Sequence, residues 1–95
     1  MTQSDVILIN VTEEIVRGLV SFMLRGPEYQ AFCNCTICEM DVNALTLNAL
    51  PPKYVSNPTM RDAAFKELNT PENIEIINRE IIRAIHIVAR QPKHK

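Results

Sequence analysis

All three cysteines of the chain lie within six residues, as Cys33, Cys35 and Cys38. This C-x-C-x-x-C spacing lets three thiolates converge on one point, and zinc binds thiolates well and usually takes four ligands. The odd number of cysteines argues against a disulfide framework. The segment therefore predicts a zinc site whose fourth ligand stays open among His86, His94, Asp41, Glu39, water and a group from a partner chain.

Other interpretations of the cysteines stay open. They can be small buried apolar residues, since cysteine is among the most buried residue types. Cys35 and Cys38 also form a C-x-x-C pair, but the strand–helix context of thioredoxin-like folds is missing, so a thiol redox sensor is the weaker alternative. If a metal binds, its expected role is structural. A small domain has a small hydrophobic core, and a metal that cross-links the chain adds stability to it.

Arginines form the second group with possible chemistry. Arg79, Arg83 and Arg90 recur at spacings of four and seven residues. The plainer interpretation is a solvated face with intrahelical ion pairs to nearby glutamates. The alternative is an anion site, because guanidinium groups match phosphate and the guanine edge, and in a dimer two such faces would suit a symmetric dianionic ligand.

Catalytic patterns are absent from the sequence. No serine has an evident histidine and carboxylate pairing, so no enzyme activity is expected. His86 is more simply a half-buried structural histidine than a ligand or a base.

Composition and charge exclude several classes of protein. The chain has 95 residues, 46% hydrophobic and 22% charged, which fits one globular domain. Ten Lys and Arg against eleven Asp and Glu give a net charge of -1, so direct nucleic-acid binding is not expected. Only two glycines leave no room for a glycine-rich phosphate loop. No signal peptide and no apolar stretch of roughly 18 residues is present, so a cytoplasmic protein without membrane contact is expected.

Four helices, separated by loops that contain proline, are expected to form an all-α bundle. Asn10 or Thr12 is expected to cap the first helix, and Glu13 stands where a capping box would place it. Pro51-Pro52 should form a rigid corner that locks the second helix to the third, followed by an extended segment 53–55. The expected helices span about 12–25, 39–50, 58–68 and, from the Thr70-Pro71 start signal, 71 to at least 88.

Two helices carry more apolar surface than one buried face needs. The helix 39–50 has a wide apolar arc and is expected to be buried on two sides. In the last helix Ile76, Ile82 and Ile87 lie off the main apolar stripe. They predict a second buried surface, most simply a homodimer interface, with a helix packed between several others in one chain as the equal alternative.

A longer pattern follows the cysteines: Asp41-Val42-x-Ala44-Leu45-x-Leu47-Asn48, then Leu50-Pro51-Pro52-Lys53-Tyr54-Val55. Together these 23 residues resemble the late competence development protein ComFB family, and the resemblance extends over about residues 10 to 91. It implies a small all-helical, homodimeric bacterial protein with zinc ligands Cys33, Cys35 and Cys38, and in some members cyclic di-GMP binding. Members of this family can supply a further cysteine nearer the C-terminus, and this chain has none.

These observations predict one domain over residues 10–91, with flexible tails at 1–9 and 92–95. The expected function is a cytoplasmic regulatory protein that binds cyclic di-GMP and relays it to a protein partner in competence- or motility-type regulation. The candidate cations for the nucleotide are Arg79, Arg83, Arg61 and Lys53. The alternative is a zinc-stapled dimeric adaptor without a nucleotide ligand.

Overall fold

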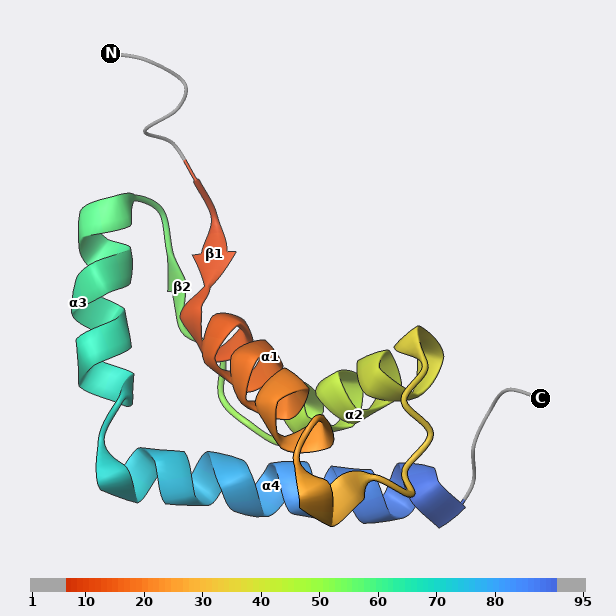
Figure 1. The fold of residues 1–95 in the computed structure, drawn as a ribbon. Helices are drawn as coiled ribbons and strands as arrows, with labels where there is room; N and C mark the ends of the chain where they lie inside the picture. Colours follow the sequence, from red (N-terminus) through yellow and green to blue (C-terminus); the bar gives the residue numbers. More distant parts are fainter. Residues whose placement is uncertain (1–6, 91–95) are drawn as a thin grey trace.

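The computed structural model describes residues 7–90, and within them four α-helices dominate (Figure 1). The all-α prediction is confirmed in outline, with a two-stranded antiparallel sheet and a short 3-10 helix in addition. No helix in this range is long and apolar enough to cross a membrane. In chain order the elements are β1 (Ile9–Asn10), α1 (Val11–Leu24), η2 (Pro27–Tyr29), α2 (Thr36–Asn48), β2 (Tyr54–Val55), α3 (Pro58–Leu68) and α4 (Pro71–Arg90).

The core lies where α1 and α2 pack on α4. Val16, Val42 and Ile81, one from each helix, are 0% exposed. The buried residues of α4 recur every three or four positions, so one stripe of that helix faces the core while the opposite face stays in solvent. Figure 1 shows α4 running beneath α1 and α2, whereas α3 lies to one side, next to β2.

The corner at Pro51-Pro52 is fastened to the start of α1. The Asn10 Oδ1 atom accepts a hydrogen bond from the Lys53 N–H at 2.8 Å. The Thr12 Oγ1 hydroxyl donates to the Pro51 carbonyl at 3.0 Å. The capping-box prediction is therefore wrong, because the Asn10 side chain serves a distant backbone donor and makes no cap bond to its own helix. The corner ties the second helix to the first.

β1 and β2 extend this attachment. Ile9 pairs with Val55, so the extended segment predicted after the prolines is confirmed. The Ile7 N–H donates to the Ser56 carbonyl at 3.2 Å. Residues 7–9, which were predicted to lie in a flexible tail, are thus hydrogen-bonded to the domain; the rest of both predicted tails lies outside the described residues.

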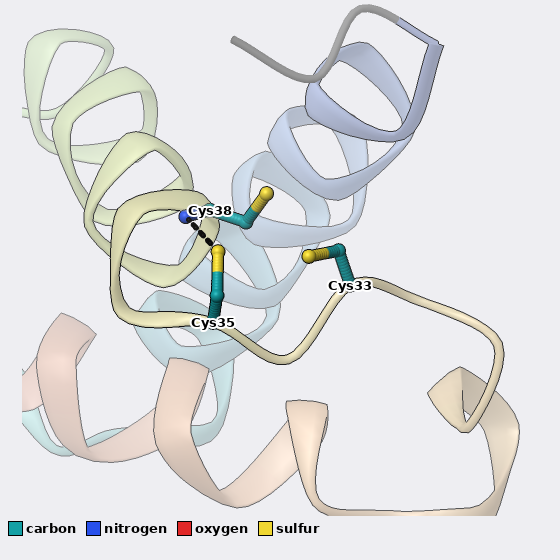
Figure 2. Close-up of side chains that lie close together, drawn as sticks. All are labelled: Cys33, Cys35 and Cys38. Atoms are coloured by element: carbon teal, nitrogen blue, oxygen red, sulfur yellow. Dashed lines mark hydrogen bonds between the residues drawn. The ribbon is translucent and has the colours of Figure 1, made fainter. Parts of the chain in front are cut away.

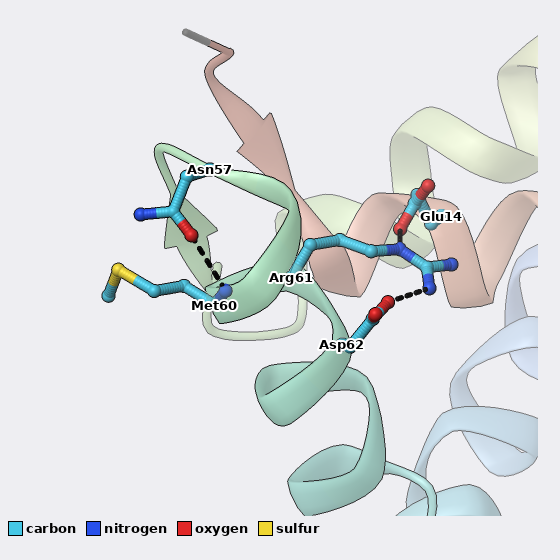
Figure 3. A network of polar contacts seen from close by, with 5 residues as sticks. All are labelled: Glu14, Asn57, Met60, Arg61 and Asp62. Carbon is cyan, nitrogen blue, oxygen red and sulfur yellow. Dashed lines mark hydrogen bonds and ion pairs between the residues drawn. The ribbon is translucent and has the colours of Figure 1, made fainter. Parts of the chain in front are cut away.

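α3 is held mainly at its first turns. The Asn57 Oδ1 atom accepts from the Met60 N–H at 2.9 Å, so Asn57 caps the helix just before Pro58. Arg61 reaches from α3 to α1, where its Nε atom lies 2.8 Å from Glu14 Oε1 (Figure 3). Ala64 is the buried residue of this helix. α3 therefore depends on polar contacts more than the other helices do.

Candidate metal centre

The cysteine cluster is built around the N-terminal end of α2. Cys35 is the N-cap, and its Sγ atom accepts a hydrogen bond from the Cys38 N–H at 3.4 Å. A thiol here takes the place of the usual Ser, Thr, Asp or Asn. The helix consequently begins at Thr36, three residues before the predicted start.

This cap brings the three sulfurs together. The Sγ atoms of Cys33, Cys35 and Cys38 all lie within 4.8 Å of one another. Figure 2 shows Cys35 and Cys38 on the opening turn of α2 and Cys33 reaching toward them from the preceding loop. The prediction that the three thiols converge is confirmed.

The three thiols differ in exposure. Cys33 is exposed, Cys35 is half-buried and Cys38 is 1% exposed. Burial, followed by hydrogen bonds and charge effects from Cys33 and Cys35, raises the pKa of Cys38 to about 12. A bound cation would oppose this shift, since it favours the thiolate form of each ligand.

The donor set fits zinc. Four ligands about 2.3 Å from zinc in a tetrahedron place sulfur atoms about 3.8 Å apart. The separations of up to 4.8 Å between the sulfurs need only a small contraction to reach that geometry. When bound, zinc would cross-link the loop before α2 to the first turn of that helix.

The fourth ligand was predicted from a wider set. Among the described residues, the cluster comprises the three cysteines, and neither His86, Glu39 nor Asp41 joins it. His86 instead lines a separate hollow of about 280 Å³, together with Glu28, Tyr29, Ala31, Phe32, Ile85 and Ala89. His94 lies outside the described residues.

The four cations predicted to bind a nucleotide lie on two helices, α3 and α4, and in the loop before β2. Lys53 Nζ lies 3.5 Å from Glu67 Oε1 in the segment before β2. Arg61 on α3 contacts Glu14 and Asp62, and its guanidinium lies 4.9 Å from the centre of the Phe65 ring. Hydrogen bonds to these two carboxylates raise the pKa of Arg61. This arginine is the most firmly engaged of the four.

Arg79 and Arg83 are held more loosely. The ion pairs that they form are 3.8 Å long, to Glu75, and 3.9 Å long, to Glu80, and their side chains are 67% and 73% exposed. Of the predicted cations, these two share the exposed side of α4, one turn apart.

Buried polar groups on α2 were not predicted. Asn43 is 4% exposed and Thr46 is 0% exposed. An oxygen of Asp41, Oδ2, is also enclosed, and among the described residues it has no hydrogen-bond partner. The available signal was a carboxylate, Asp41, placed one helical turn from both Ile37 and Leu45.

The comparisons with known proteins agree with this fold. No curated protein matches the chain. A solved structure of the late competence protein ComFB from Bacillus subtilis has a TM-score of 0.74 and 24% sequence identity, covering 92% of this chain and 96% of that one. The similarity shows a shared fold. The family model of the late competence development protein ComFB matches residues 9–92, and the chain therefore belongs to the ComFB family.

Proposed function

We propose that this protein is a non-enzymatic regulatory protein of competence-related signalling, stapled by zinc and acting by binding a protein partner. The observation that carries the proposal is the convergence of the Cys33, Cys35 and Cys38 sulfurs within 4.8 Å. Family membership supports the competence-related role. A structural metal suits a thin domain, because it adds stability that a small core cannot supply.

The metal is tested by combining a chelator with substitutions at Cys35. Serine at this position keeps an N-cap acceptor but loses the thiolate, whereas alanine loses both. A chelator should lower the melting temperature of the wild-type protein, and it should leave Cys35→Ser unchanged. Elemental analysis should find about one zinc per wild-type chain and less in the variant. Equal melting temperatures with and without the chelator, in protein free of zinc, would refute the staple.

The outer face of α4 supports a homodimer. Ile76 is 45% exposed and Ile87 is 41% exposed, and their spacing of eleven residues puts them on one side of the helix. The first half of α4 carries three carboxylates and one arginine, Arg79, whereas the second half carries Arg83, His86 and Arg90 and no carboxylate. Two copies of α4 running in opposite directions would place Ile76 against the partner's Ile87 and Glu80 beside the partner's Arg83.

Charge reversal tests this pairing. Glu80→Arg alone and Arg83→Glu alone should each give a monomeric mass by light scattering, because like charges then face each other. Mixing the two variants should restore a dimer. Arg17→Glu, on the exposed side of α1, serves as the control and should stay dimeric. Dimers that persist in both single variants would count against the α4 interface.

A cyclic dinucleotide is the second candidate ligand. Arg79 and Arg83 favour it, since exposed ion pairs at 3.8 and 3.9 Å are weak and a phosphate can displace them. A two-fold dimer would gather four such arginines on one surface. Calorimetric titration with cyclic di-GMP, with GTP as the reference ligand, tests the idea. The double variant Arg79→Ala with Arg83→Ala should weaken binding, and Arg17→Ala should not. Without saturable binding, the adaptor without a nucleotide is the better description.

A further inference from the structure

The outer face of α2 is apolar and uncovered. Ile37, Met40, Ala44 and Leu45 lie on the side of the helix opposite its buried residues Cys38, Val42 and Thr46. Ile37 is 53% exposed, Leu45 40% and Met40 37%. The sequence predicts burial of this helix on two sides, and among the described residues only one side is buried. Its second side has the composition of an interface rather than of a solvated helix face.

The charge of α2 has one sign. Between Thr36 and Asn48 there are two acidic residues, Glu39 and Asp41, and no Lys or Arg. Asp41 lies one turn from both Ile37 and Leu45, in the middle of the apolar residues. Its Oδ2 atom is enclosed and accepts no hydrogen bond from the described residues. Asp41 as a whole is half-buried, so a cation that a partner places beside the accessible part of its carboxyl group would supply the positive charge that α2 itself lacks.

We propose that the outer face of α2 binds an amphipathic helix of another protein, in which apolar residues at helical spacing are accompanied by Lys or Arg. The apolar residues would pack over Ile37, Met40 and Leu45, and a basic side chain would lie beside the accessible part of the Asp41 carboxyl group. A second copy of α2 is a poor occupant, because a two-fold pair would bring two Glu39 and two Asp41 carboxylates together. The inference rests on the proposed function in one respect, that the protein acts through a protein partner.

The test uses the full-length, zinc-loaded protein and two labelled synthetic peptides. Both are 16-residue helices with Leu at positions i, i+3, i+4 and i+7; one carries three Arg beside the Leu residues and the other three Glu. Fluorescence anisotropy should show saturable binding of the Arg peptide and none of the Glu peptide. Asp41→Asn should weaken the Arg peptide about tenfold, since it removes the charge from one hydrogen bond.

A matched control distinguishes binding at this face from non-specific binding to any exposed apolar residue. Met40→Ser should weaken the peptide, whereas Phe22→Ser should not, although Phe22 on α1 is 78% exposed and also apolar. Circular dichroism checks that the variants keep their helix content. Equal binding of both peptides, no saturation with the Arg peptide, or an unchanged affinity in Asp41→Asn would overturn the proposal. So would a monomeric mass in Met40→Asp, which would identify the occupant as a second copy.

Failure of this inference and failure of the proposed function give different results. If the zinc, the dimer and the stability behave as proposed but neither peptide binds, only the α2 surface is refuted. If the Arg peptide binds and the chelator has no effect on stability, the α2 binding surface is supported and the structural zinc is refuted.

Discussion

Cys33 and Cys38 belong to one cluster but differ in their access to solvent. Cys33 is exposed, while Cys38 is 1% exposed and its pKa is raised to about 12. The thiolate is the reactive form of cysteine, so exposure and a lower pKa both favour reaction with an alkylating reagent. The two thiols should therefore react at different rates in the absence of metal.

Iodoacetamide tests this difference on metal-free protein. Cys33 should be alkylated at least about tenfold faster than Cys38, because burial both shields the Cys38 sulfur and disfavours its thiolate. Mass spectrometry of peptides from timed samples gives the two rates. Zinc added beforehand should slow all three cysteines together. Equal rates at Cys33 and Cys38 would contradict the burial described for Cys38.

Thr12 provides the second prediction at this scale. Its side chain is held between α1 and the corner, with the residue 5% exposed and its hydroxyl donating to the Pro51 carbonyl. Thr12→Val keeps the shape and removes the donor, so the free energy of unfolding should fall by about 1–3 kcal/mol. Urea denaturation measures it. Thr59→Val, at an exposed position of α3, is the matched control and should change stability by less than about 0.5 kcal/mol.

Among the four α-helices, α3 is the one with the fewest buried residues. Its attachment to α1 depends on Arg61, which contacts Glu14 and stacks over Phe65 on its own helix. Segments with few buried contacts open locally at lower free energy than the core does. α3 should therefore exchange its amide hydrogens faster than α4.

Removing the Arg61 side chain should widen this difference. In Arg61→Ala we expect faster hydrogen exchange across residues 58–68 and unchanged exchange in α4, because the ion pair between Arg61 and Glu14 joins only α3 and α1. Mass spectrometry after timed exchange resolves the two helices. Arg17→Ala, which removes an ion pair within α1, should leave α3 as it was. A uniform rise across the whole chain would mean that Arg61 stabilises the core instead.

The sequence predicts elements best where the signal is local. Asn57 with Pro58 and Thr70 with Pro71 mark the starts of α3 and α4, and Asn57 Oδ1 and Thr70 Oγ1 accept cap bonds at 2.9 and 3.2 Å. The start of α2 was misplaced because a cysteine does the capping there. Asn10 was misassigned because its partner is 43 residues away, and no local rule describes such a contact.

The residues of the candidate site, too, could be predicted only where the signal is local in the sequence. Convergence of the three thiols could be predicted from their spacing within six residues. The enclosed oxygen of Asp41 and the uncovered side of α2 could not, since they depend on how α1 and α4 share the surface of that helix. Positions on a helix follow from periodicity, whereas the side that stays uncovered follows from tertiary packing.

At the scale of the whole molecule, the chain is long and thin. It measures 48 × 30 × 22 Å and has a radius of gyration of 14.8 Å, against about 12 Å for a compact domain of this length. A thin shape leaves few residues completely buried, so each of them carries a large share of the stability.

Ile81 in α4 is one of these residues, at 0% exposure. Ile81→Ala should lower the free energy of unfolding by about 2–5 kcal/mol, because it removes buried methyl groups and leaves a cavity. Ile37→Ala makes the same chemical change at a position that is 53% exposed, and it should lower stability by less than about 1 kcal/mol. Thermal or urea unfolding distinguishes the two. Similar losses in both variants would show that the outer face of α2 is buried in solution.

The hydrogen bond between Asn10 and Lys53 also has a consequence for synthesis of the chain. The backbone that Asn10 fastens at the start of α1 is made 43 residues after it. At roughly 5–20 residues per second, a growing chain carries an unfastened α1 for about 2–9 s before Lys53 is added. The N-terminal end of α1 therefore gains this hydrogen bond only after α2 and the double proline have been synthesised. A chain interrupted before residue 53 would lack both this hydrogen bond and α4, so the apolar side of α1 would stay exposed to solvent.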